Sequence, residues 1–208
     1  MLENEFVLLT GSSSKLGIHI AELLAKKKYN ILLHYFKSKK ETIGLSKKLE
    51  SKFKKQKFLP IYMDLSKVNS KTKLKNLMPN KTNMIGVINN ASLYFKDTKN
   101  NFKFKNYQKN INIHYRNPLA LISIIFENYK TINSNYFAIN ITDDNLDIDN
   151  YYSYSKTKSM LSKYCSEASI VDPESIRIIE FKPKKILPAK DSLKNITSFK
   201  QEFIKLLK

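Results

Sequence analysis

Two tyrosine and lysine pairs lie in the segment YYSYSKTK, and both have a spacing that suits proton transfer. Tyr152 precedes Lys156 by four residues, and Tyr154 precedes Lys158 by the same interval. Residues four apart share one face of a helix, so in either pair the ammonium lies near the phenol. A nearby cation favours the phenolate, so such a tyrosine can donate a proton to a developing anion and be recharged near neutral pH. The spacing alone fits both pairs.

A glycine-containing turn, TGSSSKLG, follows the first strand-like run and leads directly into a helical stretch. In this context one glycine permits the tight turn, another lets the helix pack closely on the sheet, and the N–H groups at the helix start face a pyrophosphate. Serines replace possible further glycines, and a strand–turn–helix often needs glycine for structure only. The position at the start of the chain favours phosphate binding, which we expect from Gly11, Ser14, Lys15, Leu16 and Gly17.

The second strand-like run ends in LHYFKS, where the choice between the two nicotinamide cofactors is made. An NAD-binding domain of this type places an acid about 20 residues beyond the glycine turn to hold the ribose 2′-hydroxyl, and that acid would repel a 2′-phosphate. This stretch has no acid and offers Lys37 and Ser38, with Lys15 in the turn itself. Lys37 is alternatively one more surface lysine, but the missing acid independently favours NADPH. We expect cofactor contacts from His34, Tyr35, Lys37 and Ser38.

Two further motifs follow the third and fourth strand-like runs. In MDLS, Asp64 is expected to accept from the adenine amino group or to cap the following helix, with Leu65 beside it. In NNAS, small and amide residues stand where the backbone must pass close to a ligand. We therefore expect Asn90, Ala91 and Ser92 to contact the cofactor.

Strand-like and helical patterns alternate along the chain, which predicts a parallel α/β sheet. Right-handed crossovers then give a doubly wound, Rossmann-like sheet in three α/β/α layers, with ligands at the carboxyl ends of the strands. We expect one NADP-binding domain over residues 1–208. Polar stretches at 96–110 and 143–150 are expected to be loops bordering the site. The expected strands are 6–9, 30–34, 58–63, 84–89, 136–141 and 176–181, and the expected helices are 16–28, 41–54, 111–129, 151–168 and 196–207.

Composition and charge narrow the environment and the partners. The longest apolar run, Pro118 to Phe126, is about half the length that a bilayer crossing needs, and no signal-peptide pattern opens the chain, so we expect a cytoplasmic protein without membrane contact. Cys165 is the only cysteine, and no Cys/His cluster offers a metal its ligands. The net charge of +19 comes almost entirely from lysine, which favours a solvated surface over nucleic-acid binding. Homo-oligomerisation stays open.

Taken in order, TGSSSKLG, LHYFKS, MDLS, NNAS and YSYSK resemble the motifs of the short-chain dehydrogenase/reductase family over residues 6 to about 188. Within that family the chain is most similar to the pteridine reductases and the bacterial dihydromonapterin or dihydrofolate reductases. The similarity rests on Lys15 before Leu-Gly in the turn, on the LHY-x-basic-Ser stretch, and on Asp143 after Ile141-Thr142. Most relatives carry a catalytic serine near that point, whereas pteridine reductases carry an aspartate.

The resemblance implies a role for each matching residue. It favours Tyr152 and Lys156 over the second pair, because the distance from the preceding strand and the serine before the lysine match the family. Asp143 and Tyr152 would deliver a proton to the ring nitrogen of a pterin, and Lys156 would hold the nicotinamide ribose. Ser92 and Tyr94 would line the pterin pocket. Pro183 would contact the cofactor.

Three departures from the family pattern accompany this resemblance. His114 stands four residues before Pro118, where the family usually has an asparagine that orders a water. The segment from Asp143 to Tyr152 is short, and only 25 residues follow Pro183 (208 − 183), too few for the further strand and closing segment of relatives. A lone histidine on a helix is more often structural than catalytic.

The function expected from the resemblance is NADPH-dependent reduction of a dihydropterin or dihydrofolate to its tetrahydro form. One alternative is a short-chain carbonyl reductase acting on, for example, a 3-oxoacyl thioester. Another is a non-catalytic NADP-binding protein, because fold analogy cannot decide function.

Overall fold

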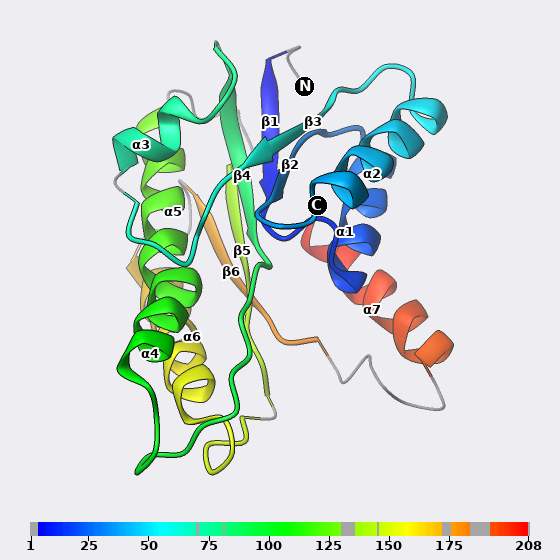
Figure 1. Ribbon diagram of the computed structural model, residues 1–208. Coiled ribbons are helices and arrows are strands. Elements are labelled where there is room, and N and C mark those ends of the chain that lie inside the picture. The colour runs from blue at the N-terminus through cyan, green and yellow to red at the C-terminus, as the bar shows by residue number, and fades with distance from the viewer. Residues whose placement is uncertain are drawn as a thin grey trace.

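Six parallel strands form one sheet at the centre of the molecule (Figure 1). The computed structural model describes residues 4–69, 71–80, 82–129, 136–144, 146–171, 176–183 and 192–207. The strand order is β3-β2-β1-β4-β5-β6. Successive strands are added outward from β1 on one side and outward from β4 on the other, so the order switches between these two parallel strands. The strands are β1 (Glu5–Leu9), β2 (Asn30–Tyr35), β3 (Phe58–Tyr62), β4 (Asn83–Asn89), β5 (Phe137–Ile141) and β6 (Arg177–Phe181). The predicted doubly wound Rossmann-like sheet is thus confirmed.

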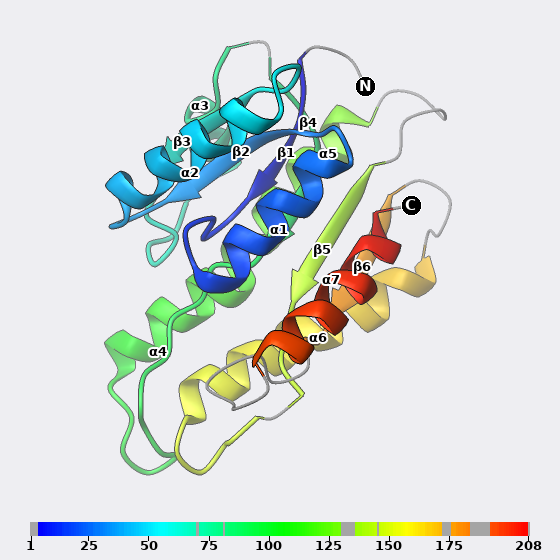
Figure 2. The same ribbon diagram turned by 90° about the vertical axis from the view of Figure 1, so that its right-hand side faces the viewer.

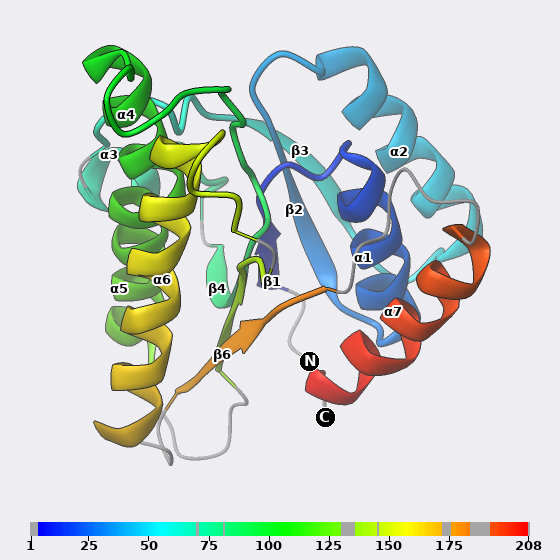
Figure 3. The same cartoon turned by 90° about the horizontal axis from the view of Figure 1, so that it is seen from below.

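Helices cover both faces of this sheet, as a three-layer fold requires (Figures 1 and 3). One face carries α1, α2 and α7, with α1 lying between the other two (Figure 2), and the opposite face carries α3 to α6. The helices are α1 (Lys15–Lys26), α2 (Lys39–Lys52), α3 (Lys71–Asn76), α4 (Phe104–Ile111), α5 (Asn117–Asn128), α6 (Tyr152–Val171) and α7 (Ser192–Leu206). Because both faces are covered, the central strands are uniformly apolar: Val7, Leu8 and Leu9 have no exposed surface.

The expected loop at 96–110 and the expected helix at 111–129 need revision. Helix α4 begins at Phe104, inside the stretch predicted to be irregular, and a π-helical turn, η1 (Asn112–Arg116), joins it to α5. Pro118 lies in the first turn of α5 and has no N–H to donate four residues back. The N–H of Asn117 instead donates to the carbonyl of Asn112, five residues back. The proline therefore explains why the helix widens there.

Two loops meet below the carboxyl edge of the sheet, near the start of α6 (Figures 1 and 2). Asp97, in the loop after β4, forms a bridge with Tyr151, and its N–H donates to the carbonyl of Asn150 at 2.9 Å. Its carboxylate accepts from the backbone N–H of Ser153 at 3.0 Å and also from the hydroxyl of Ser153. Asp97 therefore caps α6 from a distant part of the chain and fixes where that helix begins.

None of the helices in the described residues is long and apolar enough to cross a bilayer.

Candidate active site

The turn after β1 is shaped by its two glycines and locked by one amide. Gly11 has a φ of +63°, and a Cβ on Gly17 would lie 2.3 Å from the carbonyl oxygen of Gly11. We had expected Gly17 to let the helix pack closely on the sheet, but the contact that it permits is between α1 and the turn itself. The Nδ2 of Asn90 donates to the carbonyls of Thr10 and Gly11, at 2.8 and 3.0 Å, and Ser14 caps α1 by accepting from the N–H of Gly17. The result is a rigid backbone cradle at a helix N-terminus, which suits a phosphate.

His34 braces this turn from the neighbouring strand. Its Nδ1 accepts from the N–H of Gly11 at 2.9 Å, so its Nε2 carries the proton and donates to the carbonyl of Met63 at 3.0 Å. Burial lowers the pKa of His34 to about 4, so the ring is neutral near pH 7. His34 lines the cavity as predicted, but both ring nitrogens are used to join β1, β2 and β3.

The end of β2 brings cations and hydroxyls to the rim of the cavity. Lys15 and Lys37 both line it, and the ammonium of Lys37 lies 5.8 Å from the centre of the Phe36 ring. Ser38 pairs with Ser13 across the turn, with 2.5 Å between their hydroxyl oxygens. These residues provide the positive charge and the donors that a 2′-phosphate requires.

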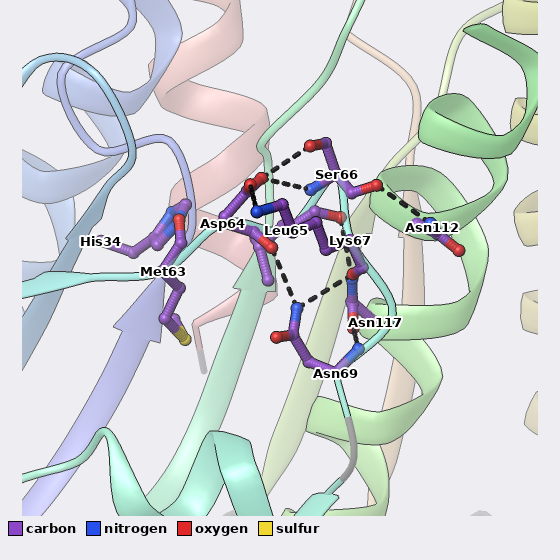
Figure 4. Close-up of polar contacts among 9 residues, drawn as sticks. All are labelled: His34, Met63, Asp64, Leu65, Ser66, Lys67, Asn69, Asn112 and Asn117. Atoms are coloured by element: carbon purple, nitrogen blue, oxygen red, sulfur yellow. Dashed lines mark hydrogen bonds and ion pairs between the residues drawn. The ribbon is translucent and has the colours of Figure 1, made fainter. Parts of the chain in front are cut away.

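Asp64 closes a tight turn just beyond β3 (Figure 4). Its Oδ1 accepts from the N–H of Ser66 at 3.1 Å and from the hydroxyl of the same residue at 2.6 Å. Lys67 lies 3.7 Å from its Oδ2. Asp64 and Leu65 line the cavity as predicted, but Asp64 does not cap α3, which begins only at Lys71.

Three buried asparagines hold the loop that carries Asp64 (Figure 4). The Nδ2 of Asn117 donates to the carbonyls of Leu65 and Lys67, both at 2.8 Å, and its Oδ1 accepts from the N–H of Asn69. Asn112 donates to the carbonyl of Ser66 at 2.9 Å. The backbone hydrogen bond of the π-helical turn joins the N–H of Asn117 to the carbonyl of Asn112. This turn therefore brings the side-chain amides of both residues to the same loop.

At the opposite end of the cavity, a tyrosine, a carboxylate and a lysine converge. The hydroxyl of Tyr154 donates to Oδ2 of Asp143 at 2.9 Å. Burial, followed by the charge of Asp143, raises the pKa of Tyr154 far above its ordinary value. The buried ammonium of Lys158 donates to the carbonyl of Ile141 at 2.6 Å, and burial lowers its pKa to about 8 although Asp143 opposes that shift. This cluster can deliver a proton from a neutral phenol held between an anion and a cation.

The structure therefore brings the pair Tyr154 and Lys158 to the cavity in place of the expected Tyr152 and Lys156. Tyr152 is the first residue of α6, packs against Phe102 at 5.4 Å between ring centres, and does not line the cavity. Lys156 is exposed, with its ammonium 6.0 Å from the centre of the Tyr152 ring. The expected pair has the expected spacing, but it lies on another face of α6.

The sequence held a signal for the correct register. Leu161 and Cys165 follow Tyr154 by seven and eleven residues, which continues one helical face, and both are buried. The positions seven and eleven residues after Tyr152 are Ser159 and Lys163, which are both exposed. The apolar stripe of α6 thus runs through Tyr154 and Lys158.

Tyr94 lines the cavity, as predicted, and belongs to a cluster of aromatic rings. It stacks on Tyr151 with 4.0 Å between ring centres and meets the ring of Tyr154 edge-on at 4.7 Å. Tyr94 thus borders the reacting end of the site, with one face of its ring already covered.

Ser92 also lines the cavity, and His114 lies beneath it. Their Oγ and Nε2 atoms are 2.8 Å apart, and the N–H of Leu93 points at the same nitrogen at 3.3 Å. The other ring nitrogen, Nδ1, lies 2.8 Å from the hydroxyl of Thr157, and the imidazole packs edge-on against the ring of Tyr154. Burial, followed by the charge of Lys158, holds the pKa of His114 well below its ordinary range.

One cavity of about 1380 Å³ joins the turn, the end of β2, the loop after β3 and the cluster around Tyr154. All the predicted cofactor and substrate residues line it except Gly17, Tyr152 and Lys156. The predicted residues on its wall are Gly11, Ser14, Lys15, Leu16, His34, Tyr35, Lys37, Ser38, Asp64, Leu65, Asn90, Ala91, Ser92, Tyr94, Asp143 and Pro183. Among the described residues, no group of three or more His, Cys, Asp or Glu side chains forms a metal site.

A doubly wound sheet with a glycine turn after β1 and a buried tyrosine and lysine at its carboxyl edge defines the class of nucleotide-dependent dehydrogenases. The sequence model of the family described as short chain dehydrogenase matches residues 5–186, so the chain belongs to that family. No curated protein sequence matches the chain significantly.

Solved structures share this fold at low sequence identity. FolM alternative dihydrofolate reductase 1 from Brucella canis, complexed with NADP, has a TM-score of 0.81 and 19% identity, covering 99% of this chain and 89% of its own. The Brucella suis protein of the same name, also with NADP, has a TM-score of 0.84 and 18% identity, covering 99% and 88%. A blue fluorescent protein from a metagenomic library, with NADPH, has a TM-score of 0.77 and 17% identity, covering 97% and 90%. Identities this low establish the shared fold alone.

Proposed function

We propose that this protein is an NADPH-dependent reductase that converts a dihydropterin or dihydrofolate to its tetrahydro form. The observation that carries the proposal is the contact between Tyr154 and Asp143 beside buried Lys158, at the end of a cavity that begins at a phosphate-binding turn. The cavity of about 1380 Å³ exceeds the usual range of about 300–1000 Å³ for a single small-molecule site, as expected where a dinucleotide and a substrate bind together.

The turn and the end of β2 fit NADPH. The positive φ of Gly11 and the close approach of Gly17 to the turn make a cradle that side chains would fill. Lys15, Lys37 and Ser38 would hold the 2′-phosphate, because the acids on the described cavity wall lie elsewhere, in the loop after β3 and near α6. The two Brucella structures and the metagenomic protein, which contain NADP or NADPH, support this choice of cofactor.

The reaction needs a hydride for a ring carbon and a proton for the adjacent ring nitrogen. Bound NADPH would supply the hydride. Tyr154 is a neutral phenol whose proton points at Asp143, so a substrate nitrogen entering between them would receive the proton from Tyr154. The Lys158 ammonium would stabilise the phenolate that remains until solvent returns the proton.

The groups at the end of β5 favour a pterin over a carbonyl substrate. Carbonyl reduction builds negative charge on oxygen, which requires hydrogen-bond donors at that position. The hydroxyl of Thr142 instead donates to Glu180 at 2.6 Å, and Asp143 presents a carboxylate that would repel an oxyanion. A carboxylate suits the amino and ring N–H groups of a pterin.

An assay of NADPH oxidation at 340 nm tests the proposal. We expect the purified protein to oxidise NADPH, but not NADH, with 7,8-dihydromonapterin or dihydrofolate, and to leave an acetoacetyl thioester unreduced. The variant Lys37→Gln should raise the KM for NADPH about tenfold, the order of a lost charge-assisted hydrogen bond, with Lys40→Gln on the adjacent helix as the control. Reduction of the thioester but of neither pterin would establish the carbonyl-reductase alternative. NADPH binding without any turnover would establish the non-catalytic one.

A further inference from the structure

The hydrogen bonds around His114 determine which of its nitrogens carries the proton. Thr157 donates its single hydroxyl proton within α6, to the carbonyl of Ser153 at 2.8 Å or of Tyr154 at 3.1 Å. Its oxygen can then only accept from Nδ1 of His114, which lies 2.8 Å away. On the other side, the N–H of Leu93 donates to Nε2, which must therefore carry a lone pair. Both sides of the ring require the same form, with the proton on Nδ1.

This arrangement also determines where the hydroxyl proton of Ser92 points. Because Nε2 is an acceptor 2.8 Å from the Ser92 oxygen, the hydroxyl of Ser92 must donate to it. The lone pairs of that oxygen are left for the cavity that Ser92 lines. A serine usually offers a ligand either role, but this one offers only an acceptor.

We propose that His114 is a positioning residue that occupies the hydroxyl proton of Ser92, so that Ser92 can only accept a hydrogen bond from a ligand. The site therefore selects a substrate edge that bears an N–H donor and rejects one that bears a carbonyl oxygen at the same position. This inference rests on the proposed function for its substrate class, a 2-amino-substituted pteridine. The Asp143 carboxylate on the same cavity wall adds a second acceptor, so the two groups favour the same kind of edge.

The proton position is measurable without any substrate. The chain has three histidines, and His34 holds the opposite form, with its proton on Nε2 between Gly11 and Met63. Nitrogen-15 NMR of the imidazoles should therefore show one ring protonated only on Nδ1 and one only on Nε2, assigned with the variants His114→Gln and His34→Gln. A proton on Nε2 of His114 would overturn the proposal whatever the protein reduces.

The selectivity is tested with two ligands that differ at one position. Pterin carries an amino group where lumazine carries a carbonyl oxygen, and both are measured by fluorescence quenching on the complex of the protein with NADP⁺. We expect wild-type protein to bind pterin at least about tenfold more tightly than lumazine, because the carbonyl oxygen of lumazine would face the Ser92 oxygen with no proton between them. The variant Ser92→Ala should bring the two affinities within about threefold of each other.

Two substitutions separate the positioning role from simple packing. His114→Gln can place an amide oxygen toward Ser92 and Leu93, whereas His114→Asn can reach only toward Thr157. We expect Gln to retain the preference for pterin and Asn to lose it, with no additional loss when Asn is combined with Ser92→Ala. Equal loss in both variants, or an unchanged preference with Asn, would show that His114 does not act through Ser92. If wild-type protein binds neither ligand, the proposed function fails, while the NMR result still decides the proton position.

Discussion

The chemistry of the site depends on a few protons whose positions the surroundings determine. Tyr154 keeps its proton because burial and the neighbouring Asp143 both raise its pKa, while burial lowers the pKa of Lys158 to about 8. A phenol that is hard to ionise needs its cation close at hand when it gives up a proton. Proton transfer from Tyr154 to a substrate would therefore depend on the ammonium of Lys158.

The variants Tyr154→Phe and Tyr152→Phe form a matched pair that tests this assignment. Both remove one hydroxyl from α6, but only Tyr154 reaches the cavity. We expect Tyr154→Phe to lower kcat by a factor of about 10² or more, the usual contribution of a positioned proton donor. Tyr152→Phe should stay within about threefold of wild type, because it changes a residue away from the site.

The measurement is kcat for dihydropterin reduction at saturating NADPH, with the Kd for NADPH as the control for folding. Both variants should bind NADPH as tightly as the wild type. A large loss of kcat with Tyr152→Phe and little with Tyr154→Phe would restore the register that the motif resemblance favoured.

At this scale nearly all the residues that the sequence singled out line the cavity, but the reacting pair was misplaced. Residue types after each strand were enough for Lys37, Asp64 and Asn90, because parallel strands deliver their ends to one edge, whereas Asp143 came from the resemblance to pteridine reductases. The pair in α6 could not be chosen by spacing, since both candidates are four apart. What decides it is which face of α6 is buried, and the stripe that Leu161 and Cys165 continue beyond the motif includes Tyr154.

At the scale of elements, the π-helical turn η1 links two ends of the cavity. Asn112 and Asn117, at its two ends, hold the loop after β3, while His114, inside it, lies beneath Ser92. Pro118 explains why the turn forms, and the spacing of five residues explains why both amides reach the same loop. The sequence contains the proline and both asparagines, but it does not show what the asparagines bind. Their partners lie in the loop after β3, which precedes η1 by more than 40 residues and meets it only in the folded structure.

The variant Asn117→Ala tests whether this turn positions the cofactor loop. It removes the donors to Leu65 and Lys67 and the acceptor for the N–H of Asn69, all in the loop that carries Asp64. Leaving buried backbone groups unpaired costs about 1–3 kcal/mol, so the loop should loosen. We expect the Kd for NADPH and for 2′,5′-ADP to rise about tenfold, while kcat at saturating NADPH stays close to that of the wild type.

Asn128→Ala is the control on the same helix, because Asn128 makes a longer bond of 3.4 Å to Met84, away from the cavity. Calorimetric titration of each variant with 2′,5′-ADP gives the comparison. Equal weakening by both variants would mean that α5 contributes general stability rather than loop position.

At the scale of the whole molecule, the alternation of apolar and amphipathic segments predicted the sheet and its layers, since the central strands are buried on both faces and the helices pack on the sheet through one face. The segment between β4 and α5 was harder to predict. Helix α4 is only eight residues long, and although Phe104, Tyr107 and Ile111 recur at helical spacing, Asn110 is its one buried residue. Helix formation there depends on packing against α6 and η1, which sequence periodicity does not reveal.

Acid stability is a property of the whole fold that its buried histidines determine. His34 and His114 are neutral in the folded protein, with the pKa of His34 lowered to about 4 and that of His114 lowered well below its ordinary range. In the unfolded chain both would bind protons below about pH 6.5. The unfolded state therefore gains protons first as the pH falls, so the free energy of unfolding must decrease from about pH 6.5 towards pH 4.

Each histidine contributes up to about 1.4 kcal/mol per pH unit within that window. Urea unfolding at pH 7.0, 6.0 and 5.0 should show this decrease in wild type and a clearly smaller decrease in His34→Gln, which removes one of the contributing groups. Because the chain carries a net charge of +19, repulsion between lysines also opposes folding, but they stay charged across this range and the effect is screened by salt. The decrease should therefore persist in 0.5 M NaCl. A free energy of unfolding that is constant from pH 6.5 to 5, or equally steep in His34→Gln, would show that these histidines do not control acid stability.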